Sequence, residues 1–174
     1  MKAADRRAAI IDRLADHMLD HGLAASSLRA LAKAAGTSDR MLLYYFADKS
    51  DLVAAALARI AERIVGFMEA QGPREPRDAE TVRREVAAIV LSADLWPYMR
   101  IWLELATLSA HGDPLYRSVG EAIGRGFLAW GTAQITAPDD AARTRDAARL
   151  LASIEGLLLL KALGLDDVCA QAVA

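Results

Sequence analysis

The chain has 174 residues, which is long enough for one large domain or for a small module with a helical body. Of these residues, 54% are hydrophobic and five are prolines. Its formal net charge of −2 excludes a protein that binds nucleic acid as a polycation along its whole length. The single cysteine, Cys169, excludes an intrachain disulfide and a metal site built from several thiolates. We expect Cys169 to be a small apolar filler in a reducing compartment.

The N-terminal stretch MKAADRRAAI lacks the long apolar core of a signal peptide, and no run approaches the roughly 18 uncharged apolar residues of a membrane helix. We therefore expect a cytoplasmic protein without a membrane partner. The charge is uneven, because residues 1–50 carry eight Lys and Arg against six Asp and Glu, whereas residues 51–174 carry 13 against 17. This mild asymmetry is compatible with a nucleic-acid partner but does not establish one.

Apolar positions spaced three and four residues apart predict an all-α protein, and no period-two strand is convincing. The predicted helices span 3–21, 28–35, 38–46, 48–71, 79–93, 96–111, 113–136, 139–163 and 166–172. The segment GPREPRD, residues 72–78, is the clearest linker, because two prolines and a glycine stop any helix there. We expect an N-terminal domain over 1–47 and a helical domain over 48–174.

The second and third predicted helices meet at a sharp corner around Gly36. Such a corner needs a small residue where the helices cross and a residue that tolerates positive φ, and Ala32 and Gly36 meet these needs. Ser26 or Ser27 is expected to cap the second helix, Ser38 the third, and Asp48 or Ser50 the fourth. A small core against the first helix is expected from Leu31, Ala35, Leu42 and Tyr45. The pattern predicts a helix-turn-helix over 28–46 rather than three ordinary packing helices.

In a helix-turn-helix, the third helix lies in the DNA major groove, with its first turn at the base edges and one flank beside phosphates. Arg40 is the best candidate for reading guanine, whereas Asp39 either accepts a hydrogen bond from cytosine or pairs with Arg40. Tyr44 and Tyr45 have hydroxyls for phosphate oxygens, and Lys49 offers a cation to the same backbone. The expected DNA contacts are Ser26, Ser27, Thr37, Ser38, Asp39, Arg40, Met41, Tyr44, Tyr45 and Lys49.

Residues 6–57 resemble the DNA-binding domain of TetR-type transcriptional repressors. The resemblance rests on His21-Gly22, SSLRALAKAAGTS, YYFADK and Leu52, and on the spacing from Gly36 to Phe46 to Lys49. It implies a three-helix helix-turn-helix domain joined by a long helix to a helical ligand-binding and dimerisation domain. It also implies a homodimer that binds a palindromic operator in double-stranded DNA and leaves it when a small molecule binds.

The chain departs from the family pattern at three positions of this motif. Leu43 stands where the family usually has Tyr, Arg40 where it often has a small residue, and Thr37 where it usually has Val. The base preference of this chain therefore cannot be taken over from other members of the family.

Large apolar side chains with few polar groups among them are concentrated in residues 79–112, a composition typical of a small-molecule site or of plain core. The candidate pocket residues are Phe67, Met68, Trp96, Met99, Trp102, Leu103, Glu104 and Leu108. Glu104 and Glu155 each either anchor a ligand cation or accept a hydrogen bond in the core. The expected effector is a small apolar molecule of unknown identity.

The helices predicted over 113–136 and 139–163 combine apolar stripes with glycines. A glycine inside a helix costs about 1 kcal/mol relative to alanine, which is tolerated where another backbone comes close. Neutral drift on a solvated face is the alternative. We expect a four-helix bundle with a second copy of the chain. The predicted interface residues are Val119, Ile123, Phe127, Trp130, Leu150, Ile154, Leu157 and Leu158.

The rival hypothesis is a helical small-molecule-binding protein or enzyme that does not bind DNA. His17 and His21 are four residues apart and could in principle hold a metal, but Asp16 and Asp20 favour a solvated, charge-paired face. No Glu-x-x-His pair and no glycine-rich phosphate loop occurs. We therefore expect no enzyme, no metal and no cofactor, and the sequence predicts a ligand-responsive transcriptional repressor.

Overall fold

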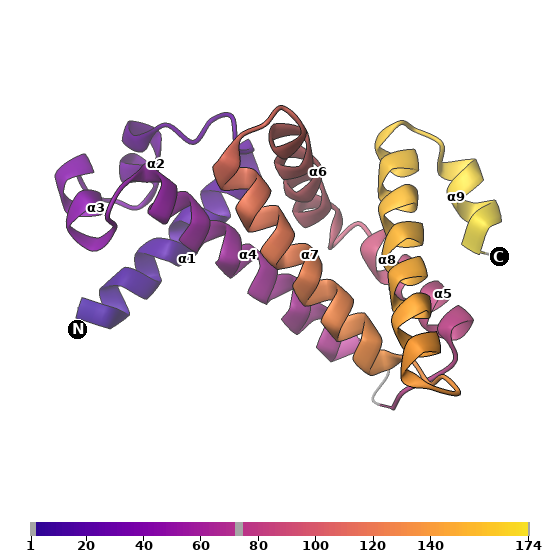
Figure 1. Ribbon diagram of the computed structural model, residues 1–174. Helices are drawn as coiled ribbons and strands as arrows, with labels where there is room; N and C mark the ends of the chain where they lie inside the picture. Colours follow the sequence, from indigo (N-terminus) through magenta and orange to yellow (C-terminus); the bar gives the residue numbers. More distant parts are fainter. Residues whose placement is uncertain (1–2, 72–74, 174) are drawn as a thin grey trace. The chain divides into compact units, whose positions relative to one another are not determined.

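The computed structural model describes residues 3–71 and 75–173, and within these ranges the regular structure is helical (Figure 1). The helices are α1 (Ala3–His21), α2 (Leu28–Ala34), α3 (Asp39–Tyr45), α4 (Lys49–Gln71), α5 (Ala79–Val90), α6 (Trp96–Ala110), α7 (Pro114–Gln134), α8 (Asp140–Ala162) and α9 (Asp166–Val173). The predicted all-α class is confirmed. The largest differences in helix length are three residues each: α5 ends at Val90 and not at residue 93, and α7 spans Pro114–Gln134 and not 113–136.

The predicted linker lies partly outside the described residues, since 72–74 are not among them. In its described part, Arg77 pairs with the segment after α7: its N–H donates to the carbonyl of Gln134 at 2.9 Å, and Thr136 donates to the carbonyl of Arg77 at 2.7 Å. Asp78 then begins α5 by accepting a hydrogen bond from the N–H of Thr81. None of the described helices is long and apolar enough to cross a membrane.

The chain forms two compact units, which divide it at residues other than the expected boundary after residue 47. The first unit comprises residues 1–63 and 100–120, and the second comprises residues 64–99 and 121–174. Helices α4, α6 and α7 each contribute residues to both units.

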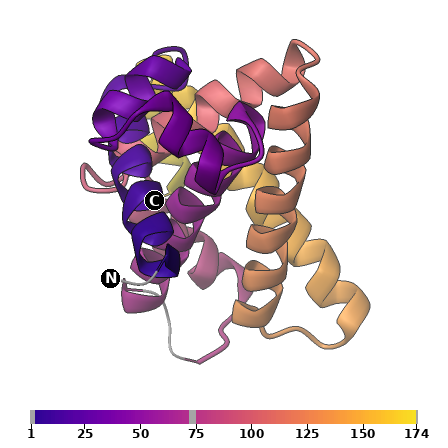
Figure 2. The ribbon, with the colours of Figure 1, turned by 90° about the vertical axis from the view of Figure 1, so that its left-hand side faces the viewer.

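The core of the first unit joins α1, α2 and α3 (Figure 2). Leu14 of α1, Leu31 of α2 and Leu42 of α3 are each 0% exposed, and Phe46 is 2% exposed. Burying one such side chain contributes about 1.5–3 kcal/mol, so these few residues hold the two short helices in place. The expected core residues Leu31 and Leu42 are thus confirmed, whereas Tyr45 is only half-buried.

Helix α1 is held to α4 by a network of ion pairs. Asp12 lies 3.2 Å from Arg59 and 3.0 Å from Arg63, and Asp16 lies 2.6 Å from Arg63. Burial lowers the pKa of Arg63, but the hydrogen bonds and charges of the two carboxylates outweigh it and raise the pKa above its usual value. The acidic side of α1 is therefore paired by arginines of α4.

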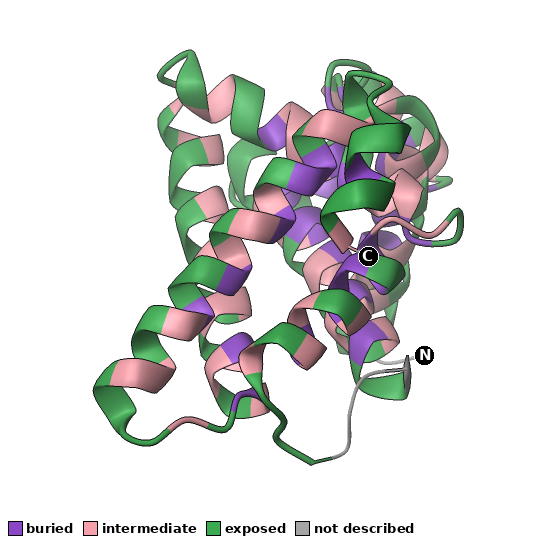
Figure 3. Cartoon of the chain, turned by 90° about the vertical axis from the view of Figure 1, so that its right-hand side faces the viewer, coloured by how far each residue is buried: buried purple, intermediate pink, exposed green. Residues whose placement is uncertain are grey.

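The core of the second unit is built mainly by α5, α8 and α9. Buried positions recur along these helices, separated by exposed ones (purple and green in Figure 3). Val82 of α5 is 0% exposed, and Cys169 of α9 is 4% exposed, with its thiol 3.5 Å from the carbonyl oxygen of Leu157. Cys169 is thus a buried filler, as predicted.

Four predicted dimer residues belong to this core and not to a free surface. They share α8 and are only 2–7% exposed: Leu150, Ile154, Leu157 and Leu158. Because these side chains already pack inside the protomer, the prediction that they contact a second copy is corrected. The apolar spacing of α8 indicated a packed face, but periodicity alone does not say which neighbour covers it.

Candidate nucleic-acid interface

The corner between α2 and α3 is built from hydrogen bonds of the backbone itself. Gly36 has φ of +64°, its N–H donates to the carbonyl of Lys33 at 3.1 Å, and Thr37 donates to Ala32 at 2.9 Å. This pair of bonds is the Schellman motif that ends a helix at a glycine. The chain is thereby turned sharply within two residues, as expected from Gly36.

Serine side chains set where the two short helices begin. The hydroxyl of Ser27 accepts a hydrogen bond from the N–H of Ala30 at 3.2 Å, and that of Ser38 accepts from Met41 at 3.3 Å. Each cap satisfies a donor that the first turn leaves without an intrahelical partner. Ser27, not Ser26, is therefore the cap of α2.

Two arginines of α1 hold the ends of this corner. The guanidinium of Arg13 donates to the carbonyl of Ala35 at 2.9 Å, just before the turn glycine. Arg7 donates to the carbonyl of Tyr45 at 3.3 Å and lies 4.7 Å from the centre of the Phe46 ring. A cation at the C-terminal end of a helix is favourable, so Arg7 stabilises the end of α3 while positioning it.

The start of α4 places a cation beside α3. Asp48 accepts a hydrogen bond from the N–H of Asp51 at 2.8 Å, and the carboxylate of Asp51 accepts one from Ala47 at 3.0 Å. This reciprocal pair resembles a capping box. Asp48, and not Ser50, is thus the cap of α4, and it leaves Lys49 exposed at the first position of the helix.

Most of the expected DNA contacts lie exposed on these segments. The exposed residues among them are Ser27, Ser38, Asp39, Arg40, Tyr44 and Lys49, and the half-buried ones are Thr37, Met41 and Tyr45. Tyr44 is 75% exposed, and its ring meets that of Tyr45 edge-on at 5.1 Å between centroids. Leu43, at the family's usual tyrosine position, is 48% exposed.

Ser26 is the exception and is withdrawn from the candidate contacts. It is 2% exposed, and its hydroxyl donates to the carbonyl of Gly22 at 3.3 Å. Its side chain thus stabilises the connector between α1 and α2 and has no free surface for a phosphate.

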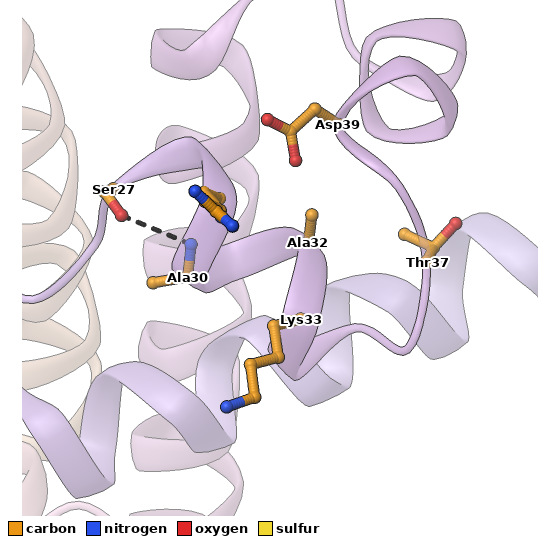
Figure 4. Close-up of a pocket in the computed structure, with 7 residues that line it drawn as sticks. Ser27, Ala30, Ala32, Lys33, Thr37 and Asp39 are labelled. Atoms are coloured by element: carbon orange, nitrogen blue, oxygen red, sulfur yellow. Dashed lines mark hydrogen bonds between the residues drawn. The ribbon is translucent and has the colours of Figure 1, made fainter.

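Two exposed cations on α2, Arg29 and Lys33, were missed in the sequence. They line an open concavity of about 590 Å³ together with Ser27, Ala30, Ala32, Thr37 and Asp39. The carboxylate of Asp39 points into this space from the start of α3, and Ala32 faces it from α2 (Figure 4). The spacing of four in LRALAK places both cations on one face of a helix, which was the available signal.

The interface combines unpaired cations with capped helix starts. Neither Arg40 nor Lys49 makes an ion pair with any described residue, and the same holds for Arg29 and Lys33. The structure therefore shows no ion pair between Asp39 and Arg40. Cations without internal partners can approach phosphate or guanine without breaking an existing ion pair.

The candidate pocket residues are divided between the two units. Phe67, Met68, Trp96 and Met99 belong to the second unit, and Trp102, Leu103, Glu104 and Leu108 to the first. Met68 and Met99 are buried, at 3% and 4% exposed, and the other six are half-buried. The carboxylate of Glu104 accepts a hydrogen bond from the N–H of Leu23 at 2.7 Å. Of its two expected roles, the hydrogen bond is thus the one present, whereas the pocket stays a prediction.

The helical glycines fall into two groups. A Cβ at Gly120 would lie 2.7 Å from Leu105, and one at Gly131 would lie 3.3 Å from Leu150, so these two accommodate neighbours within the chain. Nothing lies within 4 Å of a Cβ at Gly124, Gly126 or Gly156. The remaining predicted dimer residues, which share α7, are half-buried: Val119, Ile123, Phe127 and Trp130.

The histidine pair of α1 is stacked rather than charge-paired. The rings of His17 and His21 lie 4.4 Å apart, and Nε2 of His17 is buried without a hydrogen-bond partner among the described residues. No group of three or more potential metal ligands occurs in the described part of the chain.

Comparison with known proteins identifies the helix-turn-helix region. The family model described as "Bacterial regulatory proteins, tetR family" matches residues 10–56. The transcriptional regulator BetI of Paraburkholderia phytofirmans is 29% identical over 114 residues, which are 64% of this chain. The matched part spans 58% of the length of that relative.

Solved structures share the fold over nearly the whole chain. A protein of Rhodococcus sp. assigned to the TetR family of transcriptional regulators has a TM-score of 0.75 at 20% identity, covering 98% of this chain and 95% of its own. The multidrug binding protein EbrR, solved with proflavin, has a TM-score of 0.67 at 22% identity, covering 97% of both chains. The matched residues 10–56 contain the Gly36 corner, both serine caps and the start of α4, so this part of the chain is similar to the TetR family model, and the whole chain shares the fold of the solved structures.

Proposed function

We propose that this chain is a TetR-type transcriptional regulator, namely a ligand-responsive repressor that acts in the cytoplasm and binds a palindromic DNA operator as a homodimer. The observation that carries the proposal is the set of exposed, unpaired cations around a capped helix-turn-helix. In this proposal, residues 1–47 bind DNA together with Lys49 at the start of α4, and the rest of residues 48–174 binds the effector and the second protomer.

Base reading is assigned to the first turn of α3. Ser38 fixes the start of this helix, which leaves Asp39 and Arg40 exposed at its N-terminal end. In a helix-turn-helix this end faces the base edges of the major groove, and an arginine there pairs in two-pronged fashion with guanine. Arg40 is therefore the proposed main determinant of sequence preference.

Phosphate binding is assigned to the residues that flank this turn. Tyr44 and Lys49 lie exposed at the end of α3 and the start of α4, and Arg29 and Lys33 lie exposed on α2. Contacts to phosphates position a protein on the duplex without reading its sequence, and they make the affinity depend on salt.

The homodimer contact is proposed for the exposed side of α8. Its members are exposed and recur at helical spacing: Ala148, Ala152, Gly156 and Leu159 of the helix and Leu163, its C-cap. Leu159 and Leu163 are 53% and 66% exposed, so this side of the helix presents two large apolar side chains to solvent. Because a Cβ at Gly156 meets nothing within 4 Å, a second helix has room to approach there. The half-buried apolar residues of α7 extend this surface in the proposal.

The effector is proposed to be a small apolar or aromatic molecule. The support is the half-buried Trp96 and Trp102 within residues 79–112, the sequence region rich in large side chains. The structural neighbour EbrR is described as a multidrug binding protein and was solved with proflavin. An apolar site with few polar groups is the usual design for such a ligand.

The decisive experiment is selection from a pool of random double-stranded DNA at low salt. The proposal predicts enrichment of a palindrome whose two half-sites are about one or more helical turns apart. A matched control is the double variant Arg40→Ala/Lys49→Ala, which keeps the core and should lose the enriched sequence. No enrichment by wild-type protein, even after unfolding and refolding to remove bound ligand, would favour a helical binding protein that does not contact DNA.

A further inference from the structure

The end of α1 is closed by a glycine that leaves one backbone donor for another part of the chain. Gly22 has φ of +80°, and its N–H donates to the carbonyl of Met18 at 2.8 Å. The next N–H, that of Leu23, donates instead to the carboxylate of Glu104 on α6 at 2.7 Å. This hydrogen bond joins residues 81 apart in the sequence, both in the first unit.

The carboxylate rests directly on the backbone of this connector. A Cβ at Gly22 would lie 2.8 Å from Oε1 of Glu104 and 3.0 Å from Oε2. Any other residue at position 22 would therefore push the carboxylate of Glu104 aside, in addition to the strain of positive φ. The turn favours glycine, and the absence of its side chain leaves the carboxylate its present place.

The connector transmits this contact to the start of α2. Ser26 donates two hydrogen bonds to this connector. Its N–H donates to the carbonyl of Leu23 at 3.1 Å, and its hydroxyl donates to the carbonyl of Gly22 at 3.3 Å. Leu23 and Ser26 are buried, at 4% and 2% exposed. The next residue, Ser27, is the cap of α2, so a displacement of Leu23 moves the start of the helix-turn-helix.

The hydrogen bond to Leu23 is what holds the carboxylate at this place. Glu104 makes no ion pair with a described residue. It lies at the C-terminal end of α1, where the carbonyl groups concentrate partial negative charge that disfavours a carboxylate. A charge-assisted bond from a backbone N–H is stronger than a neutral one and offsets this repulsion.

We propose that Glu104 is a positioning residue for DNA binding: by holding Leu23, it makes the operator affinity depend on the position of α6. The inference rests on the proposed function, because it requires that α2 and α3 bind DNA. The inference gives a carboxylate outside the helix-turn-helix a role in positioning α2 and α3 for DNA binding. Any movement of α6 that withdraws Glu104 would release the connector.

The test compares full-length Glu104→Ala and Glu104→Gln with Thr107→Ala, a control on the same helix whose hydroxyl bonds only within α6. Hydrogen exchange at the Leu23 amide reports the bond in the free protein. The affinity is measured for the duplex that wild-type protein selects from a random pool, over a range of salt. Glu104→Ala should speed exchange at Leu23 and weaken binding on the order of tenfold.

The salt slope and the base preference should stay unchanged in Glu104→Ala, because no phosphate or base contact is removed. Glu104→Gln, whose amide oxygen still accepts, should recover most of the affinity, and Thr107→Ala should match wild type. Faster exchange at Leu23 without any loss of affinity would overturn the inference. Failure of wild-type protein to select any duplex would instead overturn the proposed function, and this inference with it.

A second variant guards against misfolding of Glu104→Ala. Gly22→Ala disturbs the same contact from the other side, and its effect on DNA affinity should be smaller in the Glu104→Ala background than in wild type. Equal effects in both backgrounds would mean that the two residues act separately, which contradicts the inference.

Discussion

Arg13 of α1 donates a hydrogen bond to the carbonyl of Ala35, 2.9 Å away, at the last residue before the turn that separates α2 from α3. The same guanidinium lies 3.1 Å from the position that a Cβ at Gly36 would occupy. The turn is therefore fixed on one side by its own Schellman bonds and on the other by α1. This contact links the first helix to the angle at which α3 is presented.

Replacing Arg13 should loosen this turn. Arg13→Met keeps most of the aliphatic stem but leaves the carbonyl of Ala35 without its charged donor, so we expect a loss of about 1 kcal/mol in the free energy of unfolding. Urea denaturation measures this loss. Arg6→Met, at an exposed position of the same helix, is the matched control and should change stability little. Equal stability of both variants and wild type would show that the bond contributes nothing.

Arg40 and Lys49 should differ in kind and not only in degree. Arg40→Ala should reduce discrimination between operator and unrelated DNA, whereas Lys49→Ala should weaken all duplexes alike and lower the salt slope by about one. Titration of selected and scrambled duplexes at several salt concentrations separates the two effects. A uniform loss in Arg40→Ala, with unchanged discrimination, would remove this residue from base reading.

The two faces of α8 should respond differently to substitution. Leu159→Glu/Leu163→Glu alters only exposed side chains, so we expect a folded monomer by light scattering and weaker operator binding. Leu150→Ala removes a side chain that is 7% exposed, so we expect a loss of about 2–5 kcal/mol in the free energy of unfolding. A dimer that survives both glutamates would place the interface elsewhere.

Stability should fall in mildly acidic solution because of His17. Burial lowers the pKa of His17, and the neighbouring charge of His21 lowers it further, against weaker opposing effects of the Ala25 carbonyl and Asp20. The unfolded chain therefore takes up this proton at higher pH than the folded one. The stabilising contribution is present above about pH 6.5 and is lost as the pH falls below it toward the lowered pKa.

Urea midpoints measured at about pH 7.5 and pH 5.5 test this dependence. His17→Gln should reduce the difference between the two midpoints, whereas His111→Gln, at an exposed position just after α6, should leave it as in wild type. An equal difference in all three proteins would exclude His17 as its source.

Local patterns predicted the corner of the helix-turn-helix because each part acts over a few residues. Gly36 makes the turn, Ser38 caps α3, and Leu31 and Leu42 lie on the buried faces of their helices. Each of these roles depends on residues within about one helical turn, so it can be predicted from the sequence alone. The same reasoning did not distinguish Ser26 from Ser27. One hydroxyl caps α2 and the other is buried, and this depends on the path of the connector.

The face of a helix that packs can be predicted from its sequence, but its neighbour cannot. The apolar row that includes Leu150 and Ile154 was expected to meet a second copy, but it lies in the core of its own unit, while Leu159 is exposed. The hydrogen bond between Leu23 and Glu104 was equally hidden, since it joins residues 81 apart. No spacing rule extends over such a distance.

The sequence by itself determined the all-α class, the order of the helices and the turn at Gly36, and it predicted the residues of α3 that are proposed to contact DNA. These features depend on backbone preferences and side-chain periodicity within a few residues of one another. Only the tertiary structure decided which apolar faces are already covered, which cations are unpaired, and that Glu104 holds the connector before α2. Those outcomes depend on which distant segments meet, and this is set by the packing of the chain as a whole.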